Sequence, residues 1–353
     1  MRRDSEQKLS ACGRPESRAK SRERDLNSVQ EGISIMTNKI SSKALLAIPA
    51  AAALAAAFTP RMMFHFAINP TGRLTMQEMI KTKEFTKEHK EFMKWTREEA
   101  KVRMRKSFDA LTLKAYYYAQ KKPDGSIDTD CHRYAVCVHG YGDHKLESIS
   151  TAATHFYKEG FNVMVPCLRG HGMSGGNYIG MGWYDRLDVK LWIETLAAED
   201  PEAEIVVYGI SMGGATVMCL SGDYLPAAVK CIIEDCGFSS AWDEFAYCVR
   251  TMMHIPAFPY LYLTSQICKL RCGFSFKEAS AVKQLKNARL PMLFLHGEED
   301  KFVPFEMLQK NFDACGSEHK EMMSIPGAPH ASSAQTDPEK YWGKVSEFIN
   351  KYL

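Results

Sequence analysis

Residues 205–218 read IVVYGISMGGATVM, an apolar stretch that runs into a serine with a glycine two places away on either side. The first residues have strand character, and the small and apolar residues after the second glycine suit the start of a helix. Glycine permits a sharp turn between the two because a side chain there would clash, and the hydroxyl of Ser211 is then exposed at the tip. Amide dipoles of the following helix point at negative charge that develops beside it. The pattern predicts a nucleophilic serine rather than an ordinary strand-to-helix turn.

The same succession of strand and helix signals continues along most of the chain. Strands are expected within 107–120, 133–142, 161–176, 204–209, 229–236, 291–300 and 320–330. Helices are expected between and after them, at 146–159, 183–199, 213–220, 305–314 and 341–353. Most of these strands are apolar throughout, which is typical of a parallel sheet covered on both faces. The predicted fold class is α/β, with a mainly parallel eight-stranded sheet and helices on both faces.

A serine hydroxyl is a poor nucleophile unless a base takes its proton. When such a serine ends a strand of this kind of sheet, the acid and then the histidine follow it along the chain. His330 lies in GAPHAS, after the last expected strand, where the base would be found. Asp300 follows the strand PMLFLHG and is the first choice for the acid, with Glu299 as the alternative. The acid would fix the imidazole tautomer and stabilise the imidazolium.

The same chemistry needs two N–H donors for the oxyanion that forms on the substrate. The backbone N–H of Met212, directly after the serine, is one candidate. The second is the N–H of Tyr141, because residues 139–142 have the form His-Gly-x-Gly after an expected strand. A donor of this kind stabilises the transition state by about 3 kcal/mol. His139 precedes the serine in the chain, so we expect it to brace the loop rather than act as the base.

These motifs together resemble the α/β-hydrolase superfamily, and most closely the bacterial membrane-anchored or exported hydrolases of the serine aminopeptidase S33 and monoacylglycerol-lipase-like group. The resemblance covers roughly residues 105–353. Besides GISMGG and HGYG it rests on LRGHGMSGG (168–176), WYDRLDVKLWI (183–193), LFLHGEEDKFVP (293–304) and GAPHA (327–331). It implies a Ser211–Asp300–His330 triad that works through a covalent acyl-enzyme and needs neither a metal nor an organic cofactor.

Residues 237–290 are expected to form a helical cap over the site, within a hydrolase domain at 107–353. This insertion is rich in aromatic residues and Met, and Trp242, Phe245 and Phe258 are its candidate substrate-binding residues. Packing within the cap's own small core is the alternative role for these side chains. Asp243 and Glu244 form an acidic pair that would suit the amine of a peptide substrate.

The N-terminal part of the chain differs from the rest. Residues 1–35 are polar, and we expect a disordered tail or a mis-assigned start that precedes Met36. Residues 36–60 contain Lys39 and Lys43 followed by fifteen apolar residues, the form of a signal anchor or a signal peptide. An uncleaved anchor in the cell membrane, with the hydrolase domain outside the cytoplasm, is the favoured prediction. Secretion after cleavage and a cytoplasmic location stay open.

Residues 61–106 are expected to form a basic helical linker. Between positions 81 and 106 there are ten Lys or Arg and five Glu, and nothing there breaks a helix. A basic amphipathic helix beside a membrane anchor either lies on anionic lipid or packs on the domain that follows. The net charge of +3 for the whole chain is too small to predict a nucleic-acid partner.

The chain has eleven cysteines, mostly inside apolar runs and without a CxxC motif. We expect them to be buried small hydrophobic residues rather than disulfides or metal ligands, which favours reducing surroundings. The function expected from the motifs is hydrolysis of carboxylic esters with small to medium acyl or aryl groups. Cleavage of an amide or peptide bond, or acyl transfer, would use the same triad. A membrane-tethered binding protein without catalytic activity is the alternative of another class, and the oligomeric state is left open.

Overall fold

The computed structural model describes residues 59–70, 87–254 and 256–353. Residues Thr59–Leu353 form one compact unit, which is the part considered below. The tail expected at 1–35 and nearly all of the anchor expected at 36–60 lie outside the described residues, as does 71–86 of the expected linker. Among the helices that are described, none combines the length and the apolar character needed to cross a membrane.

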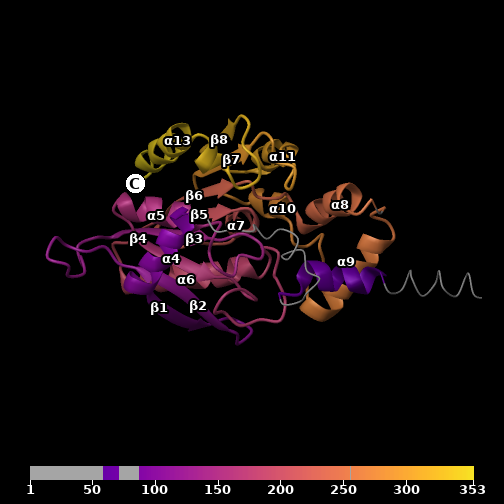
Figure 1. The fold of residues 1–353 in the computed structure, drawn as a ribbon, viewed down its shortest axis with the longest axis horizontal. Helices are drawn as coiled ribbons and strands as arrows, with labels where there is room; N and C mark the ends of the chain where they lie inside the picture. Colours follow the sequence, from indigo (N-terminus) through magenta and orange to yellow (C-terminus); the bar gives the residue numbers. More distant parts are fainter. Residues whose placement is uncertain (1–58, 71–86, 255) are drawn as a thin grey trace, which may run out of the picture. The chain divides into compact units, whose positions relative to one another are not determined.

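The core of the unit is one eight-stranded sheet, with the strand order β1-β2-β4-β3-β5-β6-β7-β8 (Figure 1). β1 and β2 pair antiparallel, β2 also pairs antiparallel with β4, and all later neighbours are parallel. The prediction of a mainly parallel eight-stranded sheet is therefore confirmed. The strands are β1 (Lys101–Lys106), β2 (Thr112–Tyr118), β3 (Arg133–Val138), β4 (Asn162–Cys167), β5 (Glu204–Ile210), β6 (Val229–Asp235), β7 (Met292–Gly297) and β8 (Lys320–Ile325).

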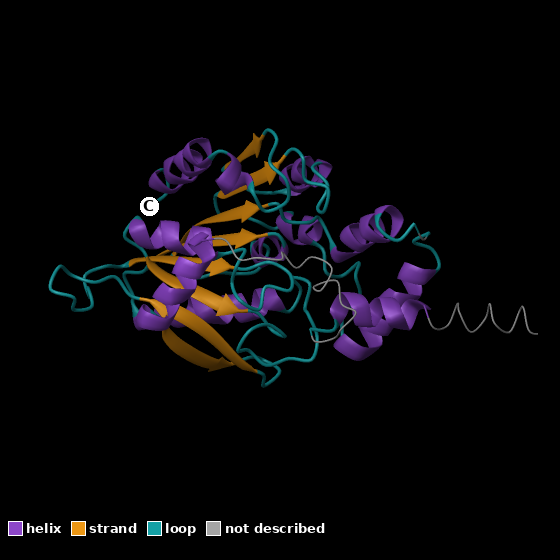
Figure 2. Cartoon of the chain, viewed as in Figure 1, coloured by secondary structure: helices purple, strands orange, loops and turns teal. Residues whose placement is uncertain are grey.

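Helices cover both faces of the sheet, as Figure 2 shows. Successive residues of a strand point to opposite faces, so Val136 and Ala135 of β3 belong to different hydrophobic clusters. One cluster includes Trp192 of α6, and the other includes Phe348 of α13. The helices are α4 (Lys87–Glu99), α5 (Ser150–Lys158), α6 (Asp185–Glu199), α7 (Met212–Leu220), α8 (Ala241–Thr251), α9 (Tyr260–Cys272), α10 (Ala281–Leu285), α11 (Glu306–Ala314), α12 (Ser333–Thr336) and α13 (Pro338–Asn350).

The prediction of a helical linker up to residue 106 is wrong at its C-terminal end. Residues Lys101–Lys106 form the edge strand β1, in which Lys101 pairs with Tyr117 of β2. Arg103 lies over the ring of Tyr117, and Arg105 forms an ion pair with Glu199 of α6 at 3.0 Å. These contacts come from residues distant in the chain, so a local sequence that suits a helix is drawn into the sheet. Basic side chains along an edge strand also oppose pairing with a second sheet.

The basic helix α4 packs on the domain with its aromatic side. Phe92 is buried, and the ring of Trp95 stacks on Tyr118 with 4.1 Å between the ring centroids. The hydroxyl of Thr96 is 2.8 Å from that of Tyr118. Of the two roles expected for this segment, packing on the following domain is the one that its aromatic residues take.

The insertion between β6 and β7 contains α8, α9 and α10, of which α10 packs back on α7. The cap proper is therefore formed by α8 and α9, which lie at one side of this unit, away from β1 and α13 (Figure 1). Residues 59–68 form a further helix beside α9, where the Thr264 hydroxyl donates to the carbonyl of Pro60 at 3.2 Å. The cap thus includes a segment that precedes the first strand of the sheet by more than thirty residues.

The ten cysteines of the described residues are all free thiols, and eight of them are buried. Most lie in strands and helices of the core, as in β3, β4, β6 and α7. In this part of the chain they act as small core residues, as the apolar runs around them predicted.

Candidate active site

Ser211 occupies a strained turn between β5 and α7. Its backbone has φ 57° and ψ −120°, a conformation that non-glycine residues rarely adopt. Steric contacts explain why both positions are glycine. A Cβ on Gly209 would lie 2.2 Å from the carbonyl oxygen of Gly213, and a Cβ on Gly213 would lie 2.0 Å from the carbonyl oxygen of Val138. The close approach of β5, α7 and β3 thus lifts the Ser211 side chain to the C-terminal edge of the sheet, as the sequence predicted.

A continuous chain of hydrogen bonds links Ser211 to His330 and Asp300. The Ser211 Oγ is 2.9 Å from His330 Nε2, and His330 Nδ1 is 2.7 Å from Asp300 Oδ2. An ionised carboxylate only accepts hydrogen bonds, so Nδ1 carries the proton and Nε2 is left to accept from the serine hydroxyl. The loops after β7 and β8 bring the acid and the base to the end of β5. All three predicted catalytic residues are therefore together, whereas the alternative acid Glu299 is exposed.

Asp300 is held as a carboxylate by its surroundings. Burial opposes its ionisation, but hydrogen bonds from His296 and His330 outweigh burial and lower the pKa of Asp300 to about 2. The other oxygen, Oδ1, accepts the N–H groups of Phe302 and Val303, each at 2.9 Å. His296 Nε2 donates to the carbonyl of Val303 at 3.0 Å and lies 3.3 Å from Asp300 Oδ2. Three donors therefore bond the carboxylate, and the ring of His296 lies close to the oxygen that His330 uses.

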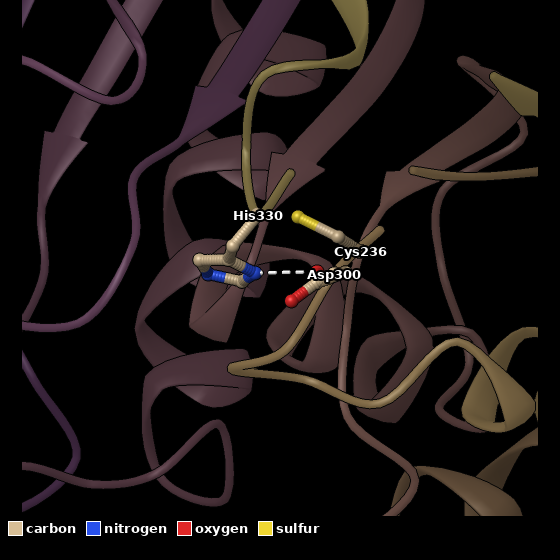
Figure 3. A group of neighbouring side chains, drawn as sticks. All are labelled: Cys236, Asp300 and His330. Atoms are coloured by element: carbon tan, nitrogen blue, oxygen red, sulfur yellow. Dashed lines mark hydrogen bonds and ion pairs between the residues drawn. The ribbon is translucent and has the colours of Figure 1, made fainter. Parts of the chain in front are cut away.

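Cys236 lies directly beside this pair at the end of β6 (Figure 3). Ligand atoms of Cys236, Asp300 and His330 lie within 4.8 Å of one another, and within the described residues this is the group that could hold a metal ion. Burial raises the pKa of the Cys236 thiol well above its ordinary value, so the sulfur is protonated. His330 Nδ1 and Asp300 Oδ2 are already bonded to each other, so the arrangement fits a hydrolytic triad better than a metal centre.

The predicted oxyanion donors flank the nucleophile. Met212 is the first residue of α7, and a Cβ on Gly140 would lie 3.4 Å from the Cβ of Ser211. The loop that carries Tyr141 therefore runs next to the serine. Within the part of the chain that the structure describes, no hydrogen bond uses the N–H of Tyr141 or of Met212. Both groups therefore remain candidate donors to a charged oxygen.

Two buried histidines hold this loop on either side of Tyr141. His139 Nδ1 donates to the carbonyl of Gly140 at 2.8 Å, and His171 Nε2 accepts the N–H of Gly142 at 3.0 Å. The other nitrogen of each ring bonds a backbone group of the loop after β4. Burial, with the neighbouring His139, lowers the pKa of His171 well below its usual range, so the ring stays neutral and Nε2 accepts. His139 is a brace as predicted.

His171 and His296 are site residues that the sequence reasoning missed. His171 belongs to LRGHG, which was used only as a family motif, and its contact with Gly142 spans 29 residues. His296 is four residues before Asp300 at the end of the strand PMLFLHG. The position of His296, a polar ring at the end of an otherwise apolar strand, could have predicted a role in the site. No local pattern predicted the hydrogen bond between His171 and Gly142.

A small apolar cavity lies between the cap and the helix of residues 59–68. It has a volume of about 50 Å³, enough for roughly three waters. The hydroxyl of Tyr141 donates to the carbonyl of Ala67 at 2.9 Å, so the cavity wall is joined to the loop of residues 139–142. The cavity is lined by Met63, Phe66, Ala67, Phe245, Cys248, Val249, Met252, Met253, Leu261, Thr264 and Phe276.

The three cap residues proposed for substrate binding lie in different places. Phe245 lines the cavity and is buried. Trp242 lies outside the lining, with the Lys277 ammonium 4.6 Å from its ring centroid. Phe258 is 77% exposed and is also outside the lining. The walls from residues 59–68 were missed because that segment was assigned to the anchor and the linker.

The acidic pair of the cap offers no free carboxylate to a substrate amine. Asp243 forms an ion pair with Lys310 at 2.8 Å and accepts a hydrogen bond from Ser239 at 2.7 Å. Glu244 is buried, and burial raises its pKa to about 8. At neutral pH it is therefore mostly protonated, with Cys248 as its hydrogen-bonded neighbour at 3.3 Å.

Comparisons with known proteins identify the family and the fold of this chain. The family model described as "Serine aminopeptidase, S33" matches residues 130–257 and 276–337, more than half of the chain, and omits the whole of α9. The Bacillus subtilis protein YqkD is 24% identical over 67% of this chain and 75% of its own. YNL320W of Saccharomyces cerevisiae, named a membrane protein, is 24% identical over 55% of this chain and 63% of its own. The Pyrococcus furiosus esterase Pf2001 shares the fold, with a TM-score of 0.57, 23% identity and coverage of 72% of this chain and 93% of its own.

Proposed function

Because this chain belongs to the serine aminopeptidase S33 family of α/β hydrolases, we propose that it hydrolyses carboxylic esters with small to medium acyl or aryl groups. The observation that carries the proposal is the hydrogen-bond chain from Ser211 Oγ through His330 to the carboxylate of Asp300. A serine with a base on one side and free backbone donors on the other is arranged for acyl transfer.

In this mechanism the Ser211 Oγ attacks the ester carbonyl carbon while His330 Nε2 takes the hydroxyl proton. The N–H groups of Tyr141 and Met212 bind the oxyanion of the tetrahedral intermediate. His330 then gives its proton to the leaving alcohol, and the acyl group remains on Ser211. Water attacks the acyl-enzyme with His330 as the base, and the carboxylic acid leaves. Asp300 stays ionised throughout and stabilises the imidazolium.

The cap favours an ester over a peptide. A peptidase that selects a free amino terminus needs an unpaired carboxylate near the site. Asp243 is paired with Lys310, and Glu244 is buried with a raised pKa, so neither supplies one. The walls of the cavity are apolar, which suits an acyl or aryl group, and Tyr141 of the loop beside Ser211 bonds one of the lining residues, Ala67.

We further propose that the protein is held at the cell membrane by residues 36–60, with the hydrolase domain outside the cytoplasm. The support is the apolar run after Lys39 and Lys43, together with a relative from yeast that is named a membrane protein.

The test is turnover of p-nitrophenyl esters from acetate to palmitate, beside a panel of aminoacyl p-nitroanilides. The protein should begin at Thr59 so that the helix of residues 59–68 is kept, and Ser211→Ala is the control. We expect turnover of short and medium esters that is lost in the variant. Turnover of anilides alone would replace the ester proposal with the peptidase. A protein that neither turns over nor reacts with a fluorophosphonate at Ser211 would be a binding protein.

A further inference from the structure

Large apolar side chains of the cap and of the helix of residues 59–68 are exposed to solvent. Among the described residues, this set comprises Met62, Met252, Met253, Phe258, Tyr262, Leu263 and Leu270, which are 37% to 87% exposed and are called the cap face here. They come from the helix of residues 59–68, from the segment after α8, and from the start and outer side of α9. Several exposed apolar residues in one part of a fold are typical of an interaction site.

The helix α9 shows how this surface is built. Tyr262, Gln266 and Lys269 recur at intervals of four and three residues, so they lie on one side of the helix with Leu263 and Leu270. All five are exposed, while the opposite side of α9 is buried against the cap. A helix with one packed side normally presents a polar outer side to water. Here the outer side carries two leucines and a tyrosine.

The same part of the chain lacks negative charge. Residues 245–277 contain no Asp or Glu, although they contain Arg250, Lys269, Arg271 and Lys277. Lys269 is paired with Glu278 at 2.7 Å, at the edge of the segment. Residues 32–77, which include the helix of residues 59–68, contain no Asp or Glu either. Apolar and aromatic side chains mixed with cations are typical of a surface that lies in the headgroup region of an anionic bilayer.

We propose that the cap face docks on an anionic lipid bilayer. A second copy of the chain is the other occupant to consider, but a symmetric contact would bring the same cationic surface of two copies together. The chain itself also favours lipid, because a run of fifteen apolar residues ends at Phe58, directly before the helix that contributes Met62. Met252 and Met253 belong both to the cap face and to the cavity lining, so the cavity opens on the docking side. The docking does not depend on the proposed esterase activity.

The test is flotation of residues 59–353, a compact unit with its own hydrophobic core, with vesicles of phosphatidylcholine alone or with about a quarter phosphatidylglycerol. The variant Leu263→Glu/Leu270→Glu changes side chains that are 42% and 87% exposed. The matched control Ile127→Glu/Tyr224→Glu changes side chains that are 44% and 88% exposed elsewhere on the surface. Both variants add two acidic groups, so a difference between them reports position and not net charge. Circular dichroism and the melting temperature check that both are folded.

We expect the wild type to bind the anionic vesicles better than the neutral ones, and binding to weaken as salt is raised. The cap variant should lose about tenfold or more of its partition coefficient, while the control stays within about threefold of the wild type. Equal losses in the two variants, or binding that ignores lipid charge, would overturn the proposal. The proposal would also be overturned if the wild type formed a dimer and did not bind vesicles, and if only the cap variant lost that dimer. In the full chain on anionic vesicles, the backbone amides of α9 should exchange more slowly in the wild type than in the cap variant.

Discussion

His171 accepts a hydrogen bond from Gly142 in the loop of residues 139–142, called the oxyanion loop here because it carries the proposed donor Tyr141. This contact gives a quantitative prediction. Replacing His171 by Leu fills this buried position with an apolar side chain of similar size. It removes the nitrogen that accepts the N–H of Gly142. The lost hydrogen bond alone corresponds to about 1 kcal/mol. Complete misplacement of one oxyanion donor corresponds to about 3 kcal/mol. The barrier should therefore rise by an amount between these limits, which lowers kcat about 5- to 150-fold.

The assay is steady-state hydrolysis of a short p-nitrophenyl ester. A donor that acts mainly on the transition state should lower kcat and kcat/KM together and leave KM nearly unchanged. His171→Gln offers an amide oxygen as an acceptor and should recover most of the rate. His144→Leu is the matched control, because this exposed ring lies 5.2 Å from that of His171 and accepts the N–H of Gly172.

Equal rates for His171→Leu and His171→Gln would refute the role of the acceptor. A change confined to KM would also refute it, because the brace would then act on substrate binding. Active-site titration with a fluorophosphonate corrects each rate for any fraction of unfolded protein. The lowered pKa of His171 adds a stability signature: stability from the neutral ring is present above the unfolded pKa of about 6.5 and is lost as pH falls below it. The Leu variant should lack this part of the acid destabilisation.

Three further perturbations follow from the packing. Gly213→Ala should abolish turnover and, in a urea titration, lower the free energy of unfolding by about 3 kcal/mol, because the new Cβ would lie 2.0 Å from the carbonyl oxygen of Val138. The control is Gly343→Ala in an open position of α13, which should leave the free energy of unfolding unchanged or raise it. Glu244 has its pKa raised to about 8, so its contribution to stability falls as pH rises from about 4.5 towards 8. Glu244→Gln should remove that fall, and an equal offset from wild type at pH 5 and pH 8 would contradict it. Deleting residues 59–70 should lower the melting temperature and the preference for butyrate over acetate esters, since this segment supplies three of the residues that line the cavity. An unchanged preference would mean that the acyl group binds elsewhere.

The part of the site that could be predicted is the part written in short local motifs. Ser211, Asp300 and His330 each follow a strand, and a parallel sheet brings such strand ends to one edge. Gly209 and Gly213 predicted the sharp turn for a steric reason, and in the structure a Cβ added to either would lie about 2 Å from a backbone oxygen. The order of the motifs along the chain was therefore sufficient to assemble the triad before any contact was known.

The remaining parts depend on contacts between distant residues. Lys101–Lys106 has a composition that suits a helix, and only the free edge of β2 makes it a strand. The bond between His171 and Gly142 joins two loops whose meeting no local pattern encodes. Phe258 is aromatic like Phe245, yet one is exposed and the other lines the cavity, because burial in the cap depends on how α8 and α9 meet the helix of residues 59–68.

The hydrogen bond between Thr264 and Pro60 also has a consequence for biosynthesis. The two residues are 204 positions apart, so the helix of residues 59–68 leaves the ribosome long before α9 exists. At about 5–20 residues per second, its apolar side waits roughly 10–40 seconds for the surface that will bury it. Met63, Phe64 and Ile68, which end up almost inaccessible to water, are exposed during that interval. The cavity that Met63 helps to line therefore forms only after α9 has been synthesised.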